Sequence, residues 1–115
     1  MSKRSGQSHR RSEERSLALH RAVAEHLRRS PQLVQIAHAN LERWIRLNGP
    51  QLAYLEWQGI LKAPLDDVIA LICEDSEHAA RLRQSSPFAG ILSEEERLRI
   101  FDAFKIGSDQ PERNR

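Results

Sequence analysis

The sequence predicts an all-α fold, a single compact bundle of five to six short helices. Apolar residues recur at spacings of three and four along most of the chain, which is the period of an amphipathic helix. Serine or proline marks each point where a helix restarts. The one continuous apolar run, residues 68–72, has no partner strand, so we expect no sheet.

Length and composition fit one domain with a partner. The 115 residues suffice for a single core but not for two. Hydrophobic residues make up 39% of the chain and charged residues 30%, so much of the surface faces solvent. No apolar run approaches the roughly 18 residues of a membrane span. The N-terminus lacks the apolar segment of a secretory signal. We therefore expect a cytoplasmic protein.

The first half of the chain predicts a basic arm and two helices. Residues 1–11 are polar and have no large apolar side chain to bury, so we expect a disordered basic arm. Ser12, followed by two glutamates, is expected to cap a helix that runs to about Arg29. Ser30-Pro31 restarts a second helix, and Asn48-Gly49 ends it.

The second half predicts four shorter helices and a polar tail. They are expected to start at Pro50, to span residues 65–73, to run from Asp75 or Ser76 to about Gln84, and to span 94–106. Ser93 and Glu96 have the spacing of a capping box. A helical domain over 12–106 and a disordered tail over 107–115 follow.

The apolar pattern also predicts which residues form the core. Phe88 and Leu92 are expected to fold back from the loop that precedes the last helix, Leu92 as half of a hydrophobic staple. Leu17 and Leu19 cannot both face one core, which favours a second buried surface. The remaining expected core residues are Leu41, Val68, Ile69, Leu71, Ile72, Leu82, Leu98 and Phe101.

No constellation for catalysis, a metal or a cofactor is present. The five histidines lack metal-ligand spacing, and His20, on an apolar face, is expected to bond to a neighbour at the edge of the core. Cys73 ends an apolar helix, and neither Ser85 nor Ser86 lies in a nucleophile motif. We therefore expect a protein that is not an enzyme and has no cofactor.

Aromatic residues are the main candidates for binding a protein partner. Trp44, Tyr54 and Trp57 lie within 14 residues of each other, and Phe88 lies in an apolar loop. Tryptophan and tyrosine dominate interface hot spots, but large aromatics also fill cores. Both interpretations stay open from the sequence alone. The preferred function is a non-enzymatic protein-interaction module, plausibly a homodimer.

The charge distribution supplies an alternative, a small nucleic-acid-binding regulator. Residues 1–49 carry ten Lys/Arg against four Asp/Glu, a net charge of +6, whereas residues 50–106 carry six against ten, a net charge of −4. The basic half can contact phosphates, an acidic partner or the acidic half of a second copy. The candidate phosphate-binding residues, in the arm and the first helix, are Lys3, Arg4, Arg10, Arg11 and Arg15.

Two segments resemble small bacterial proteins of uncharacterised function. They are residues 15–24, Arg-Ser-Leu-Ala-Leu-His-Arg-Ala-Val-Ala, and residues 82–90, Leu-Arg-Gln-Ser-Ser-Pro-Phe-Ala-Gly. Such proteins resemble antitoxin-type partners encoded beside toxin-like genes. The resemblance covers residues 15–105 and implies an all-helical partner-binding protein. It carries over no catalytic or binding residue.

Overall fold

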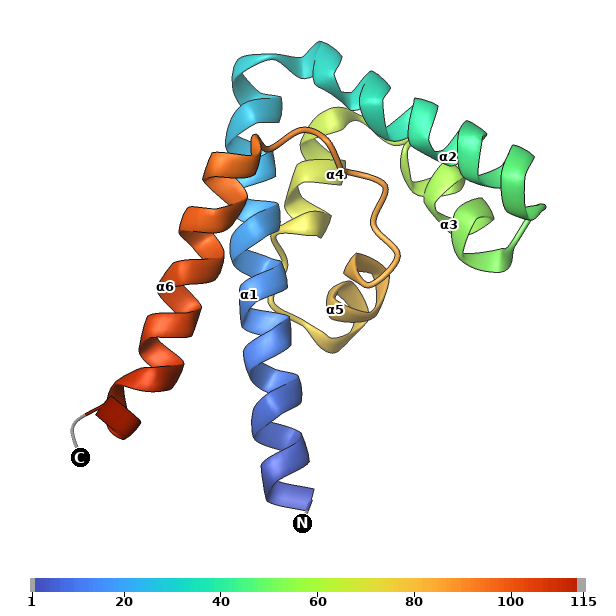
Figure 1. Ribbon diagram of the computed structural model, residues 1–115. Helices are drawn as coiled ribbons and strands as arrows, with labels where there is room; N and C mark the ends of the chain where they lie inside the picture. The colour runs from blue at the N-terminus through green and yellow to red at the C-terminus, as the bar shows by residue number, and fades with distance from the viewer. Residues whose placement is uncertain (1, 114–115) are drawn as a thin grey trace.

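The computed structural model describes the backbone of residues 2–113 and the side chains of residues 11–104. This range contains no strand, so the predicted all-α fold is confirmed (Figure 1). Its elements are α1 (Ser2–Arg29), the 3₁₀ turn η1 (Pro31–Leu33), α2 (Val34–Asn48), α3 (Leu52–Ile60), α4 (Leu65–Ile72), α5 (Glu77–Arg83) and α6 (Glu94–Arg113).

Helix α1 is the centre of the body and packs against α4, α5 and α6 (Figure 1). Because α1 has neighbours on several sides, Leu17 and Leu19 can both pack against other helices although they do not share one face of α1. Leu17 is buried, and Leu19 is half-buried against the main core. The expected second buried surface therefore lies within the chain, and Leu17 needs no partner to cover it.

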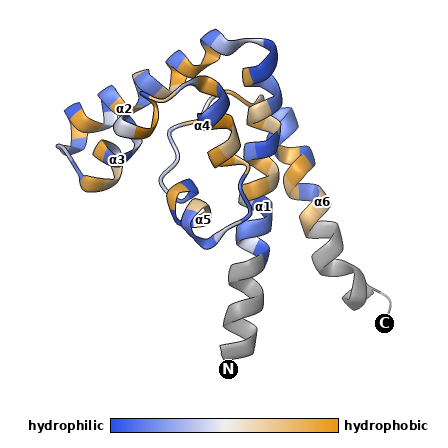
Figure 2. Cartoon of the chain, turned by 180° about the vertical axis from the view of Figure 1, so that it is seen from behind, coloured by the Kyte–Doolittle hydropathy of each residue, from blue (hydrophilic) through white to orange (hydrophobic). Residues whose placement is uncertain are grey.

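Helices α2 and α3 form a hairpin that extends from the body (Figure 1). Gly49 ends α2 with a φ of 85°, a left-handed conformation that favours glycine, as the Asn48-Gly49 pair predicts. The α5–α6 loop, residues 84–93, runs between this hairpin and the body. In Figure 2, hydrophobic residues cover α4 and also the start of α3 at the outer end of the hairpin.

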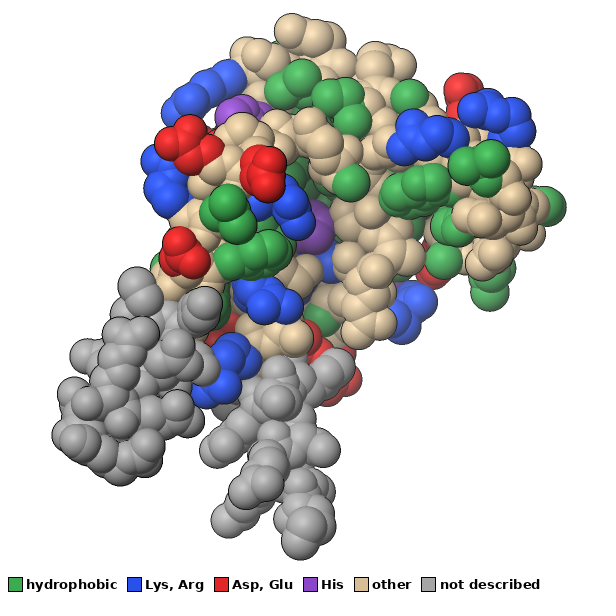
Figure 3. Space-filling model, in the orientation of Figure 1, with side chains coloured by type: hydrophobic (Ala, Val, Ile, Leu, Met, Phe, Trp, Pro, Cys, Tyr) green, Lys and Arg blue, Asp and Glu red, His purple; other side chains and the backbone are tan. Residues whose placement is uncertain are grey.

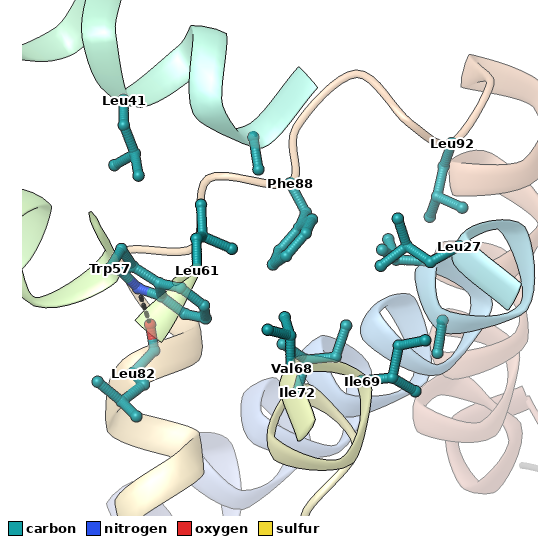
Figure 4. Packing of buried hydrophobic residues seen from close by; sticks show 13 residues of the cluster. Leu27, Leu41, Trp57, Leu61, Val68, Ile69, Ile72, Leu82, Phe88 and Leu92 are labelled. Carbon is teal, nitrogen blue, oxygen red and sulfur yellow. Dashed lines mark hydrogen bonds between the residues drawn. The ribbon is translucent and has the colours of Figure 1, made fainter. Parts of the chain in front are cut away.

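The α5–α6 loop is fastened to the hairpin by buried polar groups. The Asn40 side-chain amide donates to the carbonyls of Pro87 at 2.8 Å and Ala89 at 2.9 Å. The Trp57 indole donates to the carbonyl of Leu82, at the end of α5, at 3.0 Å (Figure 4). Buried donors and acceptors that are paired in this way avoid a desolvation penalty of about 1–3 kcal/mol each.

Phe88 fills the space between the hairpin and the body. Its ring meets the Trp57 ring edge to face, with centroids 5.8 Å apart, and lies among Leu27, Leu61 and Val68 (Figure 4). Leu92 is buried beside α1. The prediction that this loop folds back onto the core is confirmed.

The capping box at the start of α6 is confirmed, but the predicted inner face of that helix is partly wrong. The Glu96 amide donates to Ser93 Oγ at 3.1 Å, and the Ser93 amide donates to Glu96 at 3.2 Å. Glu96 also accepts from His26 of α1 at 2.8 Å, which fixes the rotation of α6. Leu98 lies about 200° further around the helix, and it is 50% exposed rather than buried. Phe101 is half-buried.

Other expectations for the core and the helix ends also differ in detail. Leu71 is half-buried against the core, whereas the other five predicted core residues are buried. The start of α1 at Ser12 is wrong, because the helix begins at Ser2. Ser30 makes no side-chain capping bond. Of the two alternatives predicted for the start of α5, Asp75 and Ser76, Ser76 is the cap.

The C-terminal end of α6 also differs from expectation, since the helix continues past Gly107. The side chains of residues 1–10 and 105–115 lie outside those described. The predicted disorder of residues 1–11 and 107–115 therefore stays a prediction. Within the described part of the chain, no helix combines the length and the apolar content that a membrane span requires.

Two leucines of opposite burial test this description of the core. Leu41 is 1% exposed. Leu41→Ala should lower the free energy of unfolding by about 2–5 kcal/mol because it leaves a cavity. Leu98→Ala should change it by no more than about 0.5 kcal/mol, since the side chain is half in water. Urea unfolding followed by circular dichroism measures both, and equal losses would contradict the orientation of α6.

Candidate functional site

The four aromatic residues predicted to bind a partner separate into two pairs. Trp57 and Phe88 are 1% and 3% exposed and belong to the core. Trp44 and Tyr54 are half-buried, one on each helix of the hairpin, and their ring centroids lie 5.7 Å apart. Burial of the first pair favours the core interpretation for Trp57 and Phe88. Only the second pair reaches the surface.

Three exposed leucines extend the second pair into an apolar surface. Leu47, Leu52 and Leu55 are 70%, 80% and 46% exposed. Leu47 and Leu52 flank the turn that joins α2 to α3, and Leu55 lies one helical turn after Leu52. Hydrophobic side chains gather over this end of the molecule in Figure 3. We call Trp44, Leu47, Leu52, Tyr54 and Leu55 the outer hairpin surface.

Polar contacts hold the outer hairpin surface in shape. The Asn48 side-chain amide at the end of α2 donates to the Tyr54 hydroxyl on α3 at 3.1 Å. Glu56 on α3 accepts from Arg81 of α5 at 3.1 Å, which ties the hairpin to the body. The helices that carry the leucines are therefore linked to each other and, through Glu56, to the body, and a surface that is ordered before binding loses less conformational entropy.

A second feature is a hollow of 710 Å³ between α1, the α5–α6 loop and α6. His20 and Ser86 lie among its lining residues, and Phe88 and Leu92 supply apolar walls. A histidine is visible at the bottom of the depression on the face shown in Figure 3. Glu94 and Arg97 line the hollow from α6 with opposite charges.

The polar groups of this hollow satisfy one another. The His20 Nδ1–H donates to the carbonyl of Ser16 at 2.7 Å, because a carbonyl can only accept. His20 Nε2 then accepts from the Ser86 hydroxyl at 2.8 Å, and Ser86 Oγ accepts from the amide of Phe88 at 3.3 Å. The expectation that His20 bonds to a neighbour at the edge of the core is confirmed.

The hydrogen bond between His20 Nε2 and Ser86 Oγ joins the α5–α6 loop to α1, whereas the bond to Ser16 orients the His20 ring within α1. A serine hydroxyl that donates to a neutral imidazole has the geometry that begins nucleophilic catalysis. Here the Ser86 oxygen already accepts from its own loop, at Phe88. In this structure His20 and Ser86 attach the loop to α1.

Burial lowers the pKa of two groups in this region. Burial lowers the pKa of His20 below its ordinary 6.5; the hydrogen bond to Ser16 opposes this shift, and the charge of Arg83 adds to it. Burial also lowers the pKa of Arg83, which donates to the carbonyls of Ile72 and Glu74 at the end of α4. A cation at a helix C-terminus stabilises it.

Of the basic residues of the alternative site, only Arg11 and Arg15 have described side chains, and they lie one turn apart on α1. The Arg15 guanidinium lies over the Phe101 ring, 5.0 Å from its centroid, and Arg97 lies over the same ring. Arg11 is exposed. The side chains of Lys3, Arg4 and Arg10 lie outside the described residues.

Known proteins and metal-binding groups give no further information on the outer hairpin surface or the hollow. No protein family, curated protein or solved structure matches this chain. Among the described side chains, no group of three or more His, Cys, Asp or Glu is placed to hold a metal ion. Cys73 is a free, half-buried thiol.

Sequence reasoning missed the residues that make the surface apolar. Leu52 and Leu55 were not among the predicted partner-binding residues, yet both are exposed, and Trp57 and Leu61 occupy the buried side of the chain here. A signal was available, since Leu52, Leu55 and Gly59 share one helix face opposite those two residues. Asn40 was also missed, because a single polar residue beside a core stripe resembles a solvent-facing one.

The lowered pKa of His20 predicts that acid weakens the fold. The unfolded chain takes up this proton near pH 6.5, above the pKa of the folded chain. The stabilisation is therefore present above pH 6.5 and is lost as the pH falls below it. Urea unfolding between about pH 7.5 and 5.5 should show this loss.

Two glutamine variants identify the titrating group. His20→Gln should flatten the pH dependence in that window, and His26→Gln should keep it, because burial and the Ser16 contact belong to His20. An unchanged slope in His20→Gln would show that another group is responsible.

Proposed function

We propose that this chain is a protein-interaction module that binds a partner protein on the outer hairpin surface. The observation that carries the proposal is the exposure of Leu47, Leu52 and Leu55 beside the half-buried Trp44–Tyr54 pair. Burying an exposed leucine contributes about 1.5–3 kcal/mol. Interface hot spots are enriched in tryptophan and tyrosine, which Trp44 and Tyr54 supply beside the leucines.

The charges near the outer hairpin surface fit a role in steering. Arg46 and Lys62 are exposed and make no ion pair with the described side chains, whereas Glu56 is paired with Arg81. Unpaired charges at the rim of an interface affect the rate of association more than the affinity. The apolar centre then supplies affinity, and the charges around it, exposed Arg46 and Glu42 among them, influence the rate of approach.

The form of this function that the sequence resemblance suggests is an antitoxin-like or regulatory partner of another bacterial protein. In that form the module covers a surface of its partner and thereby neutralises or positions it. The alternative is a nucleic-acid-binding regulator that uses the basic N-terminal residues. Salt separates the two, because phosphate contacts weaken steeply as salt rises and apolar contacts do not.

Substitution of two leucines tests the proposal. The tagged chain would be cross-linked to its partners in its own cells, captured, and compared with Leu52→Ser/Leu55→Ser. The double variant should lose the bound protein while keeping its circular dichroism spectrum, since both side chains already face solvent. Leu98→Ser is the matched control, because this exposed leucine lies on α6, and it should retain the protein.

The outcome at high salt completes this test. Binding that persists in about 0.5 M salt and needs Leu52 and Leu55 supports the proposal. Binding that survives the double serine variant would show that another surface is used. Co-purified nucleic acid that is lost in the same salt would favour the regulator.

A further inference from the structure

The outward face of α3 contains a feature that the fold of one chain does not explain. Leu52, Leu55 and Gly59 follow one another at spacings of three and four, so they form one stripe along the helix. All three are exposed. The opposite side of the helix carries Trp57, which is buried. The stripe thus offers two large apolar side chains and one residue with none.

The presence of glycine at position 59 of α3 needs an explanation. Glycine inside a helix is destabilising relative to alanine. Its φ is not in the left-handed region, which among the described glycines holds only for Gly49 and Gly90. A Cβ added at Gly59 would meet no atom within 4 Å. Neither the backbone nor internal packing therefore requires glycine here, whereas close approach from outside the chain would.

The stripe is complementary to itself in size. Leu55 is a projection and Gly59 is a notch, and they lie one helical turn apart on the same face. A two-fold axis midway between them would bring a second α3 across in the antiparallel direction. Leu55 of each copy would then lie over Gly59 of the other copy. Two-fold interfaces have this reciprocal property, in which residue i meets j and j meets i.

The charges at the ends of the stripe agree with the same arrangement. Antiparallel pairing about this axis places Leu52 of one copy opposite Lys62 of the other. Leu52 begins α3 after a three-residue turn that follows the C-terminal end of α2, where helix dipoles leave partial negative charge. Lys62 is exposed and has no ion-pair partner among the described residues. Its ammonium would then lie near the turn that follows the partner's α2, on the side of that helix's negative end.

We infer that α3 is the seam of a homodimer, in which two copies pair antiparallel with Leu55 of each over Gly59 of the other. This inference rests on the proposed function, because it names a second copy of the chain as a partner of the outer hairpin surface. Trp44 lies on α2, behind the stripe, and packs on Tyr54 to support it.

The test is sedimentation equilibrium of the full chain from about 1 µM to 1 mM, with variants that change the notch. The wild-type chain should dimerise. Gly59→Leu should raise the dissociation constant by about 30-fold or more, the effect of disturbing a central contact. Its monomer should melt no lower than the wild-type monomer, because the site is open and leucine favours helix.

Two further variants separate the seam from a general change in surface. Ala70→Leu adds a leucine at an exposed position of α4 and should leave the dissociation constant unchanged. The variant that exchanges the two residues, Leu55→Gly with Gly59→Leu, moves the projection to the position of the notch and the notch to that of the projection. It should therefore dimerise again, which a contact with an unrelated partner would not reproduce.

Each result decides the inference. Loss with Gly59→Leu and recovery in the exchanged variant support the seam. A monomer over the whole concentration range, or a dimer insensitive to Gly59→Leu, would overturn it. If the chain is monomeric and cellular capture still needs Leu52 and Leu55, the proposed function stands and its partner is a different protein. If capture is also independent of them, both proposals fail.

Discussion

The attachment of the α5–α6 loop is the constraint on which the rest of the structure depends. The loop lies between the α2–α3 hairpin and the body. His20 of α1 and Asn40 of α2 bind the loop directly. Trp57 of α3 binds the carbonyl of Leu82, at the end of α5 just before the loop. Phe88 then fills the space that these contacts enclose. The hairpin is positioned through this loop, so its stability depends on buried hydrogen bonds as much as on apolar area.

This attachment determines which aromatic residues are available to a partner. Trp57 points toward the loop and is committed to the core, so the opposite face of α3 must point outward. That face carries Leu52 and Leu55. Trp44 and Tyr54 lie between the two sides and stiffen the hairpin. The outer hairpin surface is thus a consequence of how the loop is bound, and its rigidity makes it suitable for docking.

The sequence predicted the helices well and the faces of the helices less well. Gly49, Pro31 and the Ser93–Glu96 box act locally, so their effects could be predicted from neighbouring residues. Leu98 and Leu52 could not be placed in the same way, because the rotation of each helix is set by distant contacts. His26 fixes α6 through Glu96, and Leu82 fixes α3 through Trp57. Those partners are 70 and 25 residues apart in sequence.

A nuclear magnetic resonance dilution series tests the central claim most directly, since it reports on every backbone amide of the unmodified chain. The account predicts that amide shifts change with concentration along α3, at Leu52, Leu55 and Gly59, and at Lys62 beyond its end. The amides of the α5–α6 loop, buried inside each copy, should keep their shifts. Changes centred on Phe88 and its loop, with a silent α3, would contradict the assignment of the loop to the core and of α3 to the interface.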